Sequence, residues 1–138
     1  MREELVTIEE FLTQHHVLTL ATSNATKPSA CSLFYVYDVQ ERVFVVASAK
    51  DTEHIKNLQY SINVAGNIPL ETKEVGVIRG VQFKATMQLL EDNRLKKLYY
   101  KAYPYALAML PTLWKIEVKS FKMSDNRLGF GKKLLWER

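Results

Sequence analysis

The chain has 138 residues, of which 47% are hydrophobic and 25% charged, and its formal net charge is +4. These values are typical of one globular domain over residues 1–138 and exclude a disordered, collagen-like or coiled-coil chain. No apolar run approaches the roughly 20 residues that cross a bilayer, and the first residues form no signal sequence. We therefore expect a cytoplasmic protein without a membrane partner.

Cysteine and histidine usage bears on compartment and metal binding. The single cysteine, Cys31, excludes an intrachain disulfide and a cysteine-based metal cluster, which fits a reducing compartment. His15 and His16 adjoin a predicted turn and would point in different directions, so we expect no metal site. Within an apolar strand Cys31 is expected to be a buried, unreactive thiol rather than a nucleophile.

The N-terminal half predicts one helix and three strands. Thr7 and Glu10 have capping-box spacing at the start of a helical apolar pattern. Three runs rich in β-branched and aromatic residues then predict strands, at 16–22, 30–37 and 42–48. Polar turn residues occupy 23–28 and 38–41, so the second and third strands should form a hairpin.

The middle of the chain predicts a short helix and two more strands. The helix is capped by Asp51 or Thr52 and ends near Tyr60. The two strands are predicted at 61–67 and 75–90, and apolar and polar residues alternate strictly in the second half of the latter. Gly80 within this strand predicts a bulge or a close approach to its backbone.

The C-terminal third predicts covering helices and a last strand. Asp92 caps a helix, Pro104 begins a short helical piece, and 114–119 alternates as a strand. Residues 126–136 read as a turn-containing tail. About six mostly sequential strands favour a mainly β fold, a six-stranded antiparallel barrel with short covering helices, over a parallel α/β fold.

Basic residues are concentrated late in the chain. Such a cluster is either a solvated sheet edge or a surface that contacts phosphate or nucleic acid, and we expect the solvated edge. The residues concerned are Lys115, Lys119, Lys122, Arg127, Lys132, Lys133 and Arg138.

The segment 48–54 passes directly from a strand end into a helix start. Backbone N–H groups and the positive end of the helix dipole converge at such a junction, which favours a bound phosphate. Lys50 would supply charge, and Ser48 and Thr52 would donate hydroxyl hydrogen bonds. The alternative is that Thr52 or Asp51 only caps the helix while Lys50 is solvated.

Several strings resemble those of a known superfamily. Residues 43–50 and the following helix resemble the phosphate-binding segment of the flavin mononucleotide (FMN)-binding split barrels related to pyridoxamine 5′-phosphate oxidase. A closer resemblance is to the YhbP-like bacterial family of that superfamily. It is carried by the strings at 16–22, 34–38, 78–84 and 128–133.

This resemblance implies a homodimer with FMN in a groove between the subunits. It assigns the FMN phosphate to Lys50 with Thr52 and Ser48 beside it. It places further residues near the flavin, with Arg79 and Gln82 reaching it from the second subunit and Arg127 near substrate. The remaining residues near the flavin ring are Cys31, Ser32, Val46 and Ala47.

The implied function is an FMN-dependent oxidoreductase with an unknown substrate and a nicotinamide or deazaflavin electron partner. Two departures motivate an alternative, a non-catalytic dimer that binds another ligand such as haem. Ser29 and Ala30 stand where the vitamin B6 oxidases have an FMN-binding arginine, and Lys122 replaces an aromatic residue. No carboxylate pair or Ser-His-Asp arrangement predicts a catalytic residue, and we expect no nucleic-acid partner.

Overall fold

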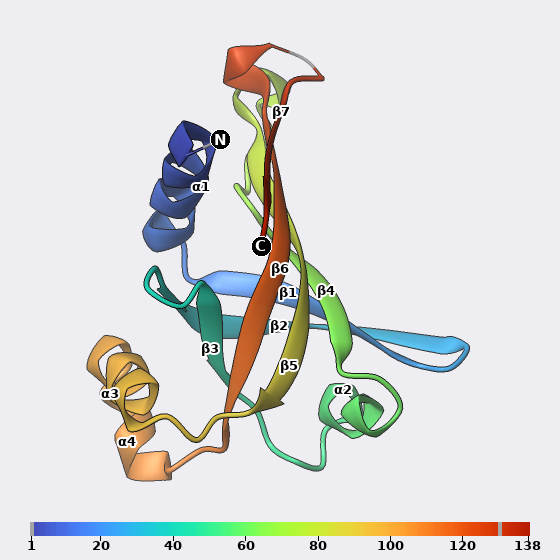
Figure 1. The fold of residues 1–138 in the computed structure, drawn as a ribbon, viewed down its shortest axis with the longest axis vertical. Helices are drawn as coiled ribbons and strands as arrows, with labels where there is room; N and C mark the ends of the chain where they lie inside the picture. Colours follow the sequence, from blue (N-terminus) through green and yellow to red (C-terminus); the bar gives the residue numbers. More distant parts are fainter. Residues whose placement is uncertain (1, 130) are drawn as a thin grey trace.

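The computed structural model describes residues 2–129 and 131–138, in which one antiparallel sheet closes into a barrel (Figure 1). The strand order is β3-β2-β1-β4-β5-β6-β7, and a second pairing of β3 with the first half of β6 closes the barrel. The strands are β1 (Val17–Asn24), β2 (Lys27–Asp38), β3 (Val43–Ala47), β4 (Asn63–Pro69), β5 (Arg79–Leu89), β6 (Leu113–Asp125) and β7 (Lys133–Glu137). The predicted mainly β antiparallel barrel is therefore confirmed.

Short helices surround this barrel. They are α1 (Arg2–Gln14), α2 (Glu53–Lys56), α3 (Asn93–Ala102) and α4 (Ala106–Met109), with 3-10 turns η1 (Asn57–Gln59), η2 (Val75–Val77) and η3 (Asn126–Leu128). In Figure 1, α1 lies beside the upper barrel, α3 and α4 lie together at the lower end, and η3 lies at the top. None of the helices in the described part of the chain is long and apolar enough to cross a membrane.

The main core lies between α1 and the inner face of the barrel. Phe44 is fully buried at its centre, with its ring centroid 5.0 Å from that of Phe83 and 5.1 Å from that of Tyr35. The Tyr35 hydroxyl donates a 2.7 Å hydrogen bond to the Leu12 carbonyl, which fixes the end of α1 on the barrel. Aromatic rings thus occupy the centre of a core that aliphatic side chains complete.

Alternation along β5 is confirmed. Val81, Phe83, Ala85 and Met87 are buried, whereas Gln82, Lys84 and Gln88 are exposed. A strand in a closed barrel packs one face into the core, so this period of two is the expected signature.

One strand was not predicted from the sequence. Residues 126–136 were expected to be a tail, yet Lys133–Glu137 forms β7 and pairs with Ser120–Ser124 of β6. β6 is itself longer than predicted, because its first half pairs with β3 and its second half with β7. Pairing between segments distant in sequence therefore decides this region.

The bulge or close backbone approach predicted at Gly80 does not occur there, and both features occur at other residues. The irregular pairing of β5 falls between Lys84 and Ala85, and a Cβ on Gly80 would make only ordinary contacts. The close approach is at Gly66 of β4, where a Cβ would clash with the Thr19 carbonyl oxygen and the Phe83 ring. Gly66 leaves the space that the Phe83 ring fills.

The predicted capping box is also wrong. α1 begins at Arg2, so Thr7 lies within the helix, where its hydroxyl donates to the Glu3 carbonyl at 3.1 Å. The Asp92 cap is confirmed, since its carboxylate accepts from the N–H groups of Arg94 and Leu95.

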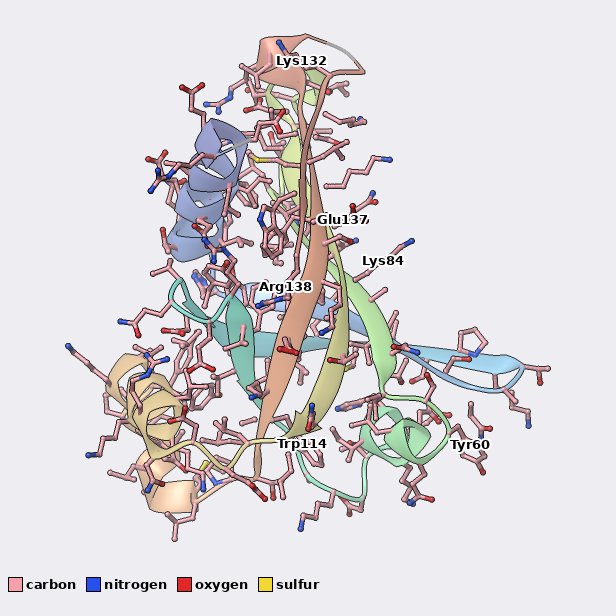
Figure 2. The ribbon with its side chains drawn as sticks, viewed as in Figure 1. Tyr60, Lys84, Trp114, Lys132, Glu137 and Arg138 are labelled. Atoms are coloured by element: carbon pink, nitrogen blue, oxygen red, sulfur yellow. The ribbon has the colours of Figure 1, made fainter. Side chains whose placement is uncertain are left out.

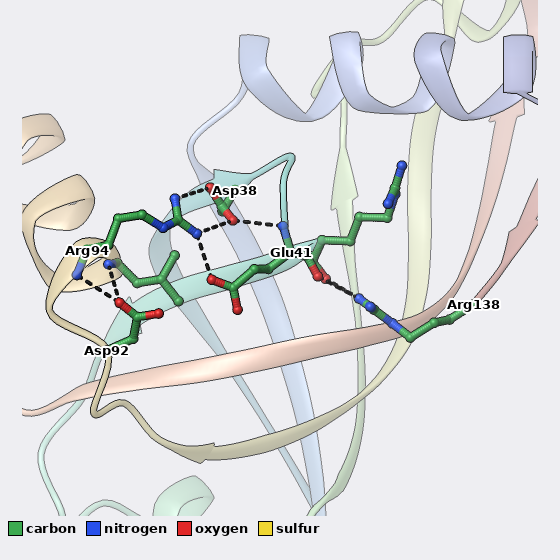
Figure 3. A network of polar contacts seen from close by, with 7 residues as sticks. Asp38, Glu41, Asp92, Arg94 and Arg138 are labelled. Carbon is green, nitrogen blue, oxygen red and sulfur yellow. Dashed lines mark hydrogen bonds and ion pairs between the residues drawn. The ribbon is translucent and has the colours of Figure 1, made fainter.

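An ion-pair network holds α3 against the β2–β3 turn (Figure 3). Arg94 donates to both carboxylate oxygens of Asp38 at 2.9 Å and to Glu41 at 2.7 Å. The Asp38 side chain is nearly buried, and its bonds from Arg94 lower its pKa. We call this ion-pair network the clamp. It joins α3 to the β2–β3 turn next to a second apolar cluster, to which residues of α3 and β3 both contribute.

Candidate functional site

Two rows of side chains cross the outer face of the sheet. In an antiparallel sheet, directly opposed residues project from the same face. The strand register therefore aligns Ser32, Thr19, Asn67, Gln82, Lys122 and Leu135 in one row and Ala30, Ala21, Ala65, Lys84, Ser120 and Glu137 in the next. We call these two rows the outer face.

The outer face is hollowed into a groove of about 1020 Å³. Gln82, Lys84 and Lys122 line it with other members of both rows. The lining also includes Arg2 and Leu5 of α1 and the core-side residues Gly66, Phe83, Phe121 and Trp136, so the groove extends beyond the two rows. Figure 2 shows Lys84 and Glu137 on the side of the sheet away from α1. The volume lies at the upper end of the range of small-molecule sites, about 300–1,000 Å³.

Charge and side-chain size suit the groove to a flat anionic ligand. Three basic residues, Arg2, Lys84 and Lys122, line the groove with one carboxylate, Glu137, so its lining carries a net positive charge. Small residues, among them Ala21, Ala65 and Gly66, also line the groove. A floor of small residues allows close approach of a ring system, and the amide and hydroxyl groups around it offer hydrogen bonds.

A second cluster forms where β3 passes into α2. The Ser48 hydroxyl lies 2.6 Å from Nε2 of His54 and 3.5 Å from the Thr52 hydroxyl, which is itself 3.3 Å from the same nitrogen. Trp114 Nε1 donates to the Ser48 carbonyl at 2.8 Å, and the Ser48 N–H donates to Thr112 at 3.0 Å. These two hydrogen bonds hold the Ser48 backbone against Thr112 and against Trp114 of β6.

The contact between His54 and Ser48 was not predicted from the sequence. Burial lowers the pKa of His54, with the nearby Glu53 carboxylate opposing that effect, so the neutral ring is favoured at neutral pH. A neutral ring with its proton on Nδ1 accepts the Ser48 hydrogen, whereas a protonated ring donates to Ser48 and leaves its hydroxyl hydrogen for a ligand.

The hydroxyl and ammonium groups at this connection suit a phosphate group, and one carboxylate nearby opposes its charge. Lys50 is exposed, and Ser48 lies beside it with its hydroxyl half-buried. The Thr52 hydroxyl donates to the Ala49 carbonyl at 2.8 Å, and Thr52 is the N-cap residue of α2 without a side-chain cap bond. Glu53 brings a carboxylate to the same region, where it accepts a 3.2 Å hydrogen bond from Ser29.

The structure separates the other predicted site residues by face. Ser32 and Gln82 share one row of the outer face. Cys31 points the other way and packs against the core, and burial raises the pKa of its thiol. Arg79 lies three residues from Gln82 and therefore also points inward, with its guanidinium 5.5 Å from the Phe11 ring.

Val46 and Ala47 occupy the end of β3. Val46 is fully buried and pairs on both sides, with Tyr35 of β2 and Trp114 of β6. Ala47 pairs with Leu113 of β6, and the register with β2 ends one residue earlier. One backbone edge of Ala47, next to Ser48, is thus outside the ladder and faces the connection.

Arg127 belongs to η3, and η3 lies at the opposite end of the barrel from the β3–α2 connection (Figure 1). Its guanidinium makes two hydrogen bonds with the Asp125 carboxylate, at 3.0 and 2.8 Å, and thereby lowers the pKa of that buried group. Within one protomer the structure does not bring Arg127 to Ser48, Lys50 and Thr52. Among the described residues, no group of three or more His, Cys, Asp or Glu side chains converges as a metal site would require.

This barrel, with its covering helices, is the fold of the split-barrel proteins related to pyridoxamine 5′-phosphate oxidase. A putative pyridoxamine 5′-phosphate oxidase from Listeria innocua superposes with a TM-score of 0.68 at 16% identity, covering 85% of this chain and 94% of that one. A FAD-binding protein from Mesorhizobium loti gives 0.70 at 15% identity, covering 86% and 91%. The haem storage protein HutZ from Vibrio cholerae gives 0.69 at 16% identity, covering 82% and 88%.

Sequence relatives define the family within this class. The chain is 35% identical over 139 residues to a UPF0306 protein of Cronobacter sakazakii, covering 99% of this chain and 96% of that protein. It is 33% identical to the UPF0306 protein YhbP of Escherichia coli, covering 99% and 95%. The chain matches no family model. It belongs to the UPF0306 family, and the predicted resemblance to YhbP-like proteins is confirmed.

Proposed function

We propose that the protein is a cytoplasmic FMN-binding homodimer. In this arrangement Lys50, Ser48 and Thr52 of one protomer hold the flavin phosphate, and the outer face of its partner covers the ring. The observation that carries the proposal is the convergence of the Ser48 and Thr52 hydroxyls, 3.5 Å apart, in the segment that also carries the exposed Lys50. Hydroxyl and ammonium donors bind a phosphate monoester, and the Ser48 and Thr52 hydroxyl hydrogens, which lie toward His54 and the Ala49 carbonyl in this structure, would turn to the phosphate on binding.

The need for two protomers follows from how the surfaces are divided. Lys50, Ser48 and Thr52 are not among the described residues that line the groove, and the groove itself is open to solvent. Small-molecule sites bury about 70–90% of the surface of their ligand. A partner that brings its groove over the β3–α2 connection would enclose the flavin, and each surface alone would leave it exposed.

The chemistry of such a site would come from the cofactor. A flavin supplies hydride and electron transfer, while the protein supplies binding, orientation and electrostatics. The Ser32 hydroxyl and the Gln82 amide share one row and offer donors and acceptors to the polar edge of a flavin ring. With a nicotinamide or a deazaflavin as electron partner, the protein would act as an oxidoreductase.

A titration with two flavins tests the phosphate role. We expect Lys50→Ala to weaken FMN binding about tenfold, the effect of losing one charged hydrogen bond of roughly 1.4 kcal/mol. Riboflavin, which lacks the phosphate, should bind wild type and variant alike. The matched control is Lys56→Ala, an exposed lysine of α2. Equal loss of both flavins, or no binding of either by wild type, would reject the proposal.

A second candidate function is haem binding. His15 Nδ1 is hydrogen-bonded to the Phe11 carbonyl and His54 Nε2 to Ser48. His16 is exposed and stacked against Phe34 with ring centroids 6.2 Å apart, where an imidazole would be available as an axial ligand. Haem titration should then give a defined Soret shift that His16→Ala removes and His15→Ala retains. An identical spectrum for wild type and His16→Ala would reject this alternative.

A further inference from the structure

The segment between Lys101 and Lys115 contains no charged residue, and much of it is exposed. Ala106 is buried and anchors α4 in the second apolar cluster. The residues around it point away from the protein: the exposed fractions are 66% for Tyr105, 54% for Leu107, 76% for Met109 and 74% for Leu110. We call these four side chains the α4 tip.

Leu110 has an unusual backbone for its residue type. It ends α4 in the left-handed region, with φ +46° and ψ +57°. Glycine or asparagine adopts this conformation at lower cost, because a larger side chain is crowded by the neighbouring carbonyl. A leucine here is unfavourable for the backbone and is not buried, so neither packing nor the turn explains it.

Lysines flank the α4 tip on both sides in sequence. Lys97 and Lys101 are exposed on α3, Lys96 lines a small surface pocket together with Pro111, and Lys115 begins the outer side of β6. Asp92, an acidic residue of the same region, is engaged in capping α3. Glu91 is the remaining carboxylate close in sequence, and Asp38 and Glu41, which also lie against α3, are paired with Arg94, so lysines supply the unpaired charge of the flanking segments.

We propose that the α4 tip docks onto an anionic phospholipid surface. The four apolar side chains would enter the interface between headgroups and acyl chains, and the lysines would lie among the headgroups. The α4 tip would contact one leaflet of the bilayer and would not cross it. The sequence predicted no membrane partner, because its apolar residues here become a surface only when Ala106 is buried beneath them.

The shape of the region favours a lipid surface over a second copy of the chain. α4 lies at the lower extremity of the molecule, next to α3 (Figure 1). A specific protein interface uses about 20–30 residues on each side. Four side chains at an extremity provide much less, whereas a fluid lipid surface requires no complementary shape.

Cosedimentation with vesicles tests the proposal. Wild type should bind vesicles of phosphatidylcholine with phosphatidylserine and should bind pure phosphatidylcholine vesicles weakly. Leu110→Asn should reduce binding several-fold while keeping the fold, because asparagine tolerates the left-handed backbone. The matched control is Leu128→Asn in η3, where the leucine is 49% exposed at the other end of the barrel.

The contribution of the lysines is tested separately. The double variant Lys97→Ala/Lys101→Ala should lose roughly fivefold in binding for each lysine, and the loss should shrink at high salt. Lys132→Ala, at the top of the molecule in Figure 2, is the control and should bind as wild type does.

Three results with vesicles would overturn the proposal. They are failure of wild type to bind the anionic vesicles, binding by Leu110→Asn equal to that of wild type, and equal binding to neutral and anionic vesicles. Gel filtration of wild type and Leu110→Asn tests the alternative that a second copy of the chain binds the α4 tip. A dimeric wild type and a monomeric variant would assign the α4 tip to contact between copies and would reject lipid docking.

Discussion

The inner and outer faces of the same strands follow different rules. On β5 the inner side chains, such as Phe83 and Met87, are buried, whereas Gln82 and Lys84 on the outer side are exposed and polar around a groove. Packing decides which residues the inner face tolerates, because interiors are close-packed. The outer face of the described chain is under no such packing constraint, so polar and charged side chains are tolerated there.

The largest effect is expected at the centre of the inner face. Phe44→Ala should lower the free energy of unfolding by about 4 kcal/mol, since a fully buried aromatic ring is replaced by a cavity. The matched outer substitution is Phe34→Ala, whose side chain is 50% exposed and should lose about 1 kcal/mol. Urea unfolding measures both, and equal losses would contradict the distinction between the faces.

A second, smaller effect is expected at Gly66. Gly66→Ala should cost about 3 kcal/mol, because its new Cβ would clash with the Thr19 carbonyl oxygen and displace the Phe83 ring. Gly76→Ala makes the same chemical change in open space, where it should be neutral or slightly stabilising. Thermal unfolding of the two variants measures the difference. A Gly66→Ala variant as stable as wild type would contradict the close packing of Gly66 against the Thr19 carbonyl and the Phe83 ring.

The clamp on α3 should contribute less than the core. Asp38→Asn should cost about 2 kcal/mol at neutral pH, the lower part of the range for hydrogen bonds to charged groups, because the partner Arg94 is half-exposed and solvent screens the pair. Urea unfolding at several pH values provides the measurement.

The pH dependence of this clamp has a definite sign. Arg94 lowers the pKa of Asp38 in the folded state, so the carboxylate stabilises the fold fully above its unfolded pKa of about 4. That contribution is lost as the pH falls through the folded pKa. The difference between wild type and Asp38→Asn should therefore shrink on acidification, and a difference independent of pH would exclude the ion pair as its source.

The smallest stability effects are expected on the outer face. Gln82→Ala and Lys122→Ala should each change the free energy of unfolding by less than about 0.5 kcal/mol, because neither side chain is buried. Both should nevertheless weaken FMN binding about fivefold to tenfold if the groove covers the flavin. Unchanged FMN affinity in both variants would remove the groove from the proposed site.

The sequence predicted what alternation and local turns determine. The strand pattern around Phe83, the turn at 38–41 and the Asp92 cap depend on neighbouring residues, and all three are confirmed. β7 was missed because Gly129, Gly131 and nearby lysines resemble a tail, and only its pairing with β6 makes it a strand. Gly66 was missed because the ring that requires it belongs to another strand.

The candidate site was predictable in part. A period of two places Arg79 and Gln82 on opposite faces, and Cys31 and Ser32 likewise, so the sequence contained the signal that only one of each pair shares the outer face. The contact between His54 and Ser48 had no such signal, because it depends on how the chain bends between β3 and α2. The groove residues of β4 and β6 also meet only through long-range pairing.

Analytical ultracentrifugation observed at the visible absorption band of the flavin shows whether the cofactor lies between two copies of the chain. One chain has a mass of 16.0 kDa. With FMN added, we expect the protein-bound flavin to sediment with the mass of two chains, and we expect Lys50→Ala to shift the flavin to the free fraction. Flavin that sediments with single chains, or that stays free with wild type, would contradict a cofactor held between two protomers.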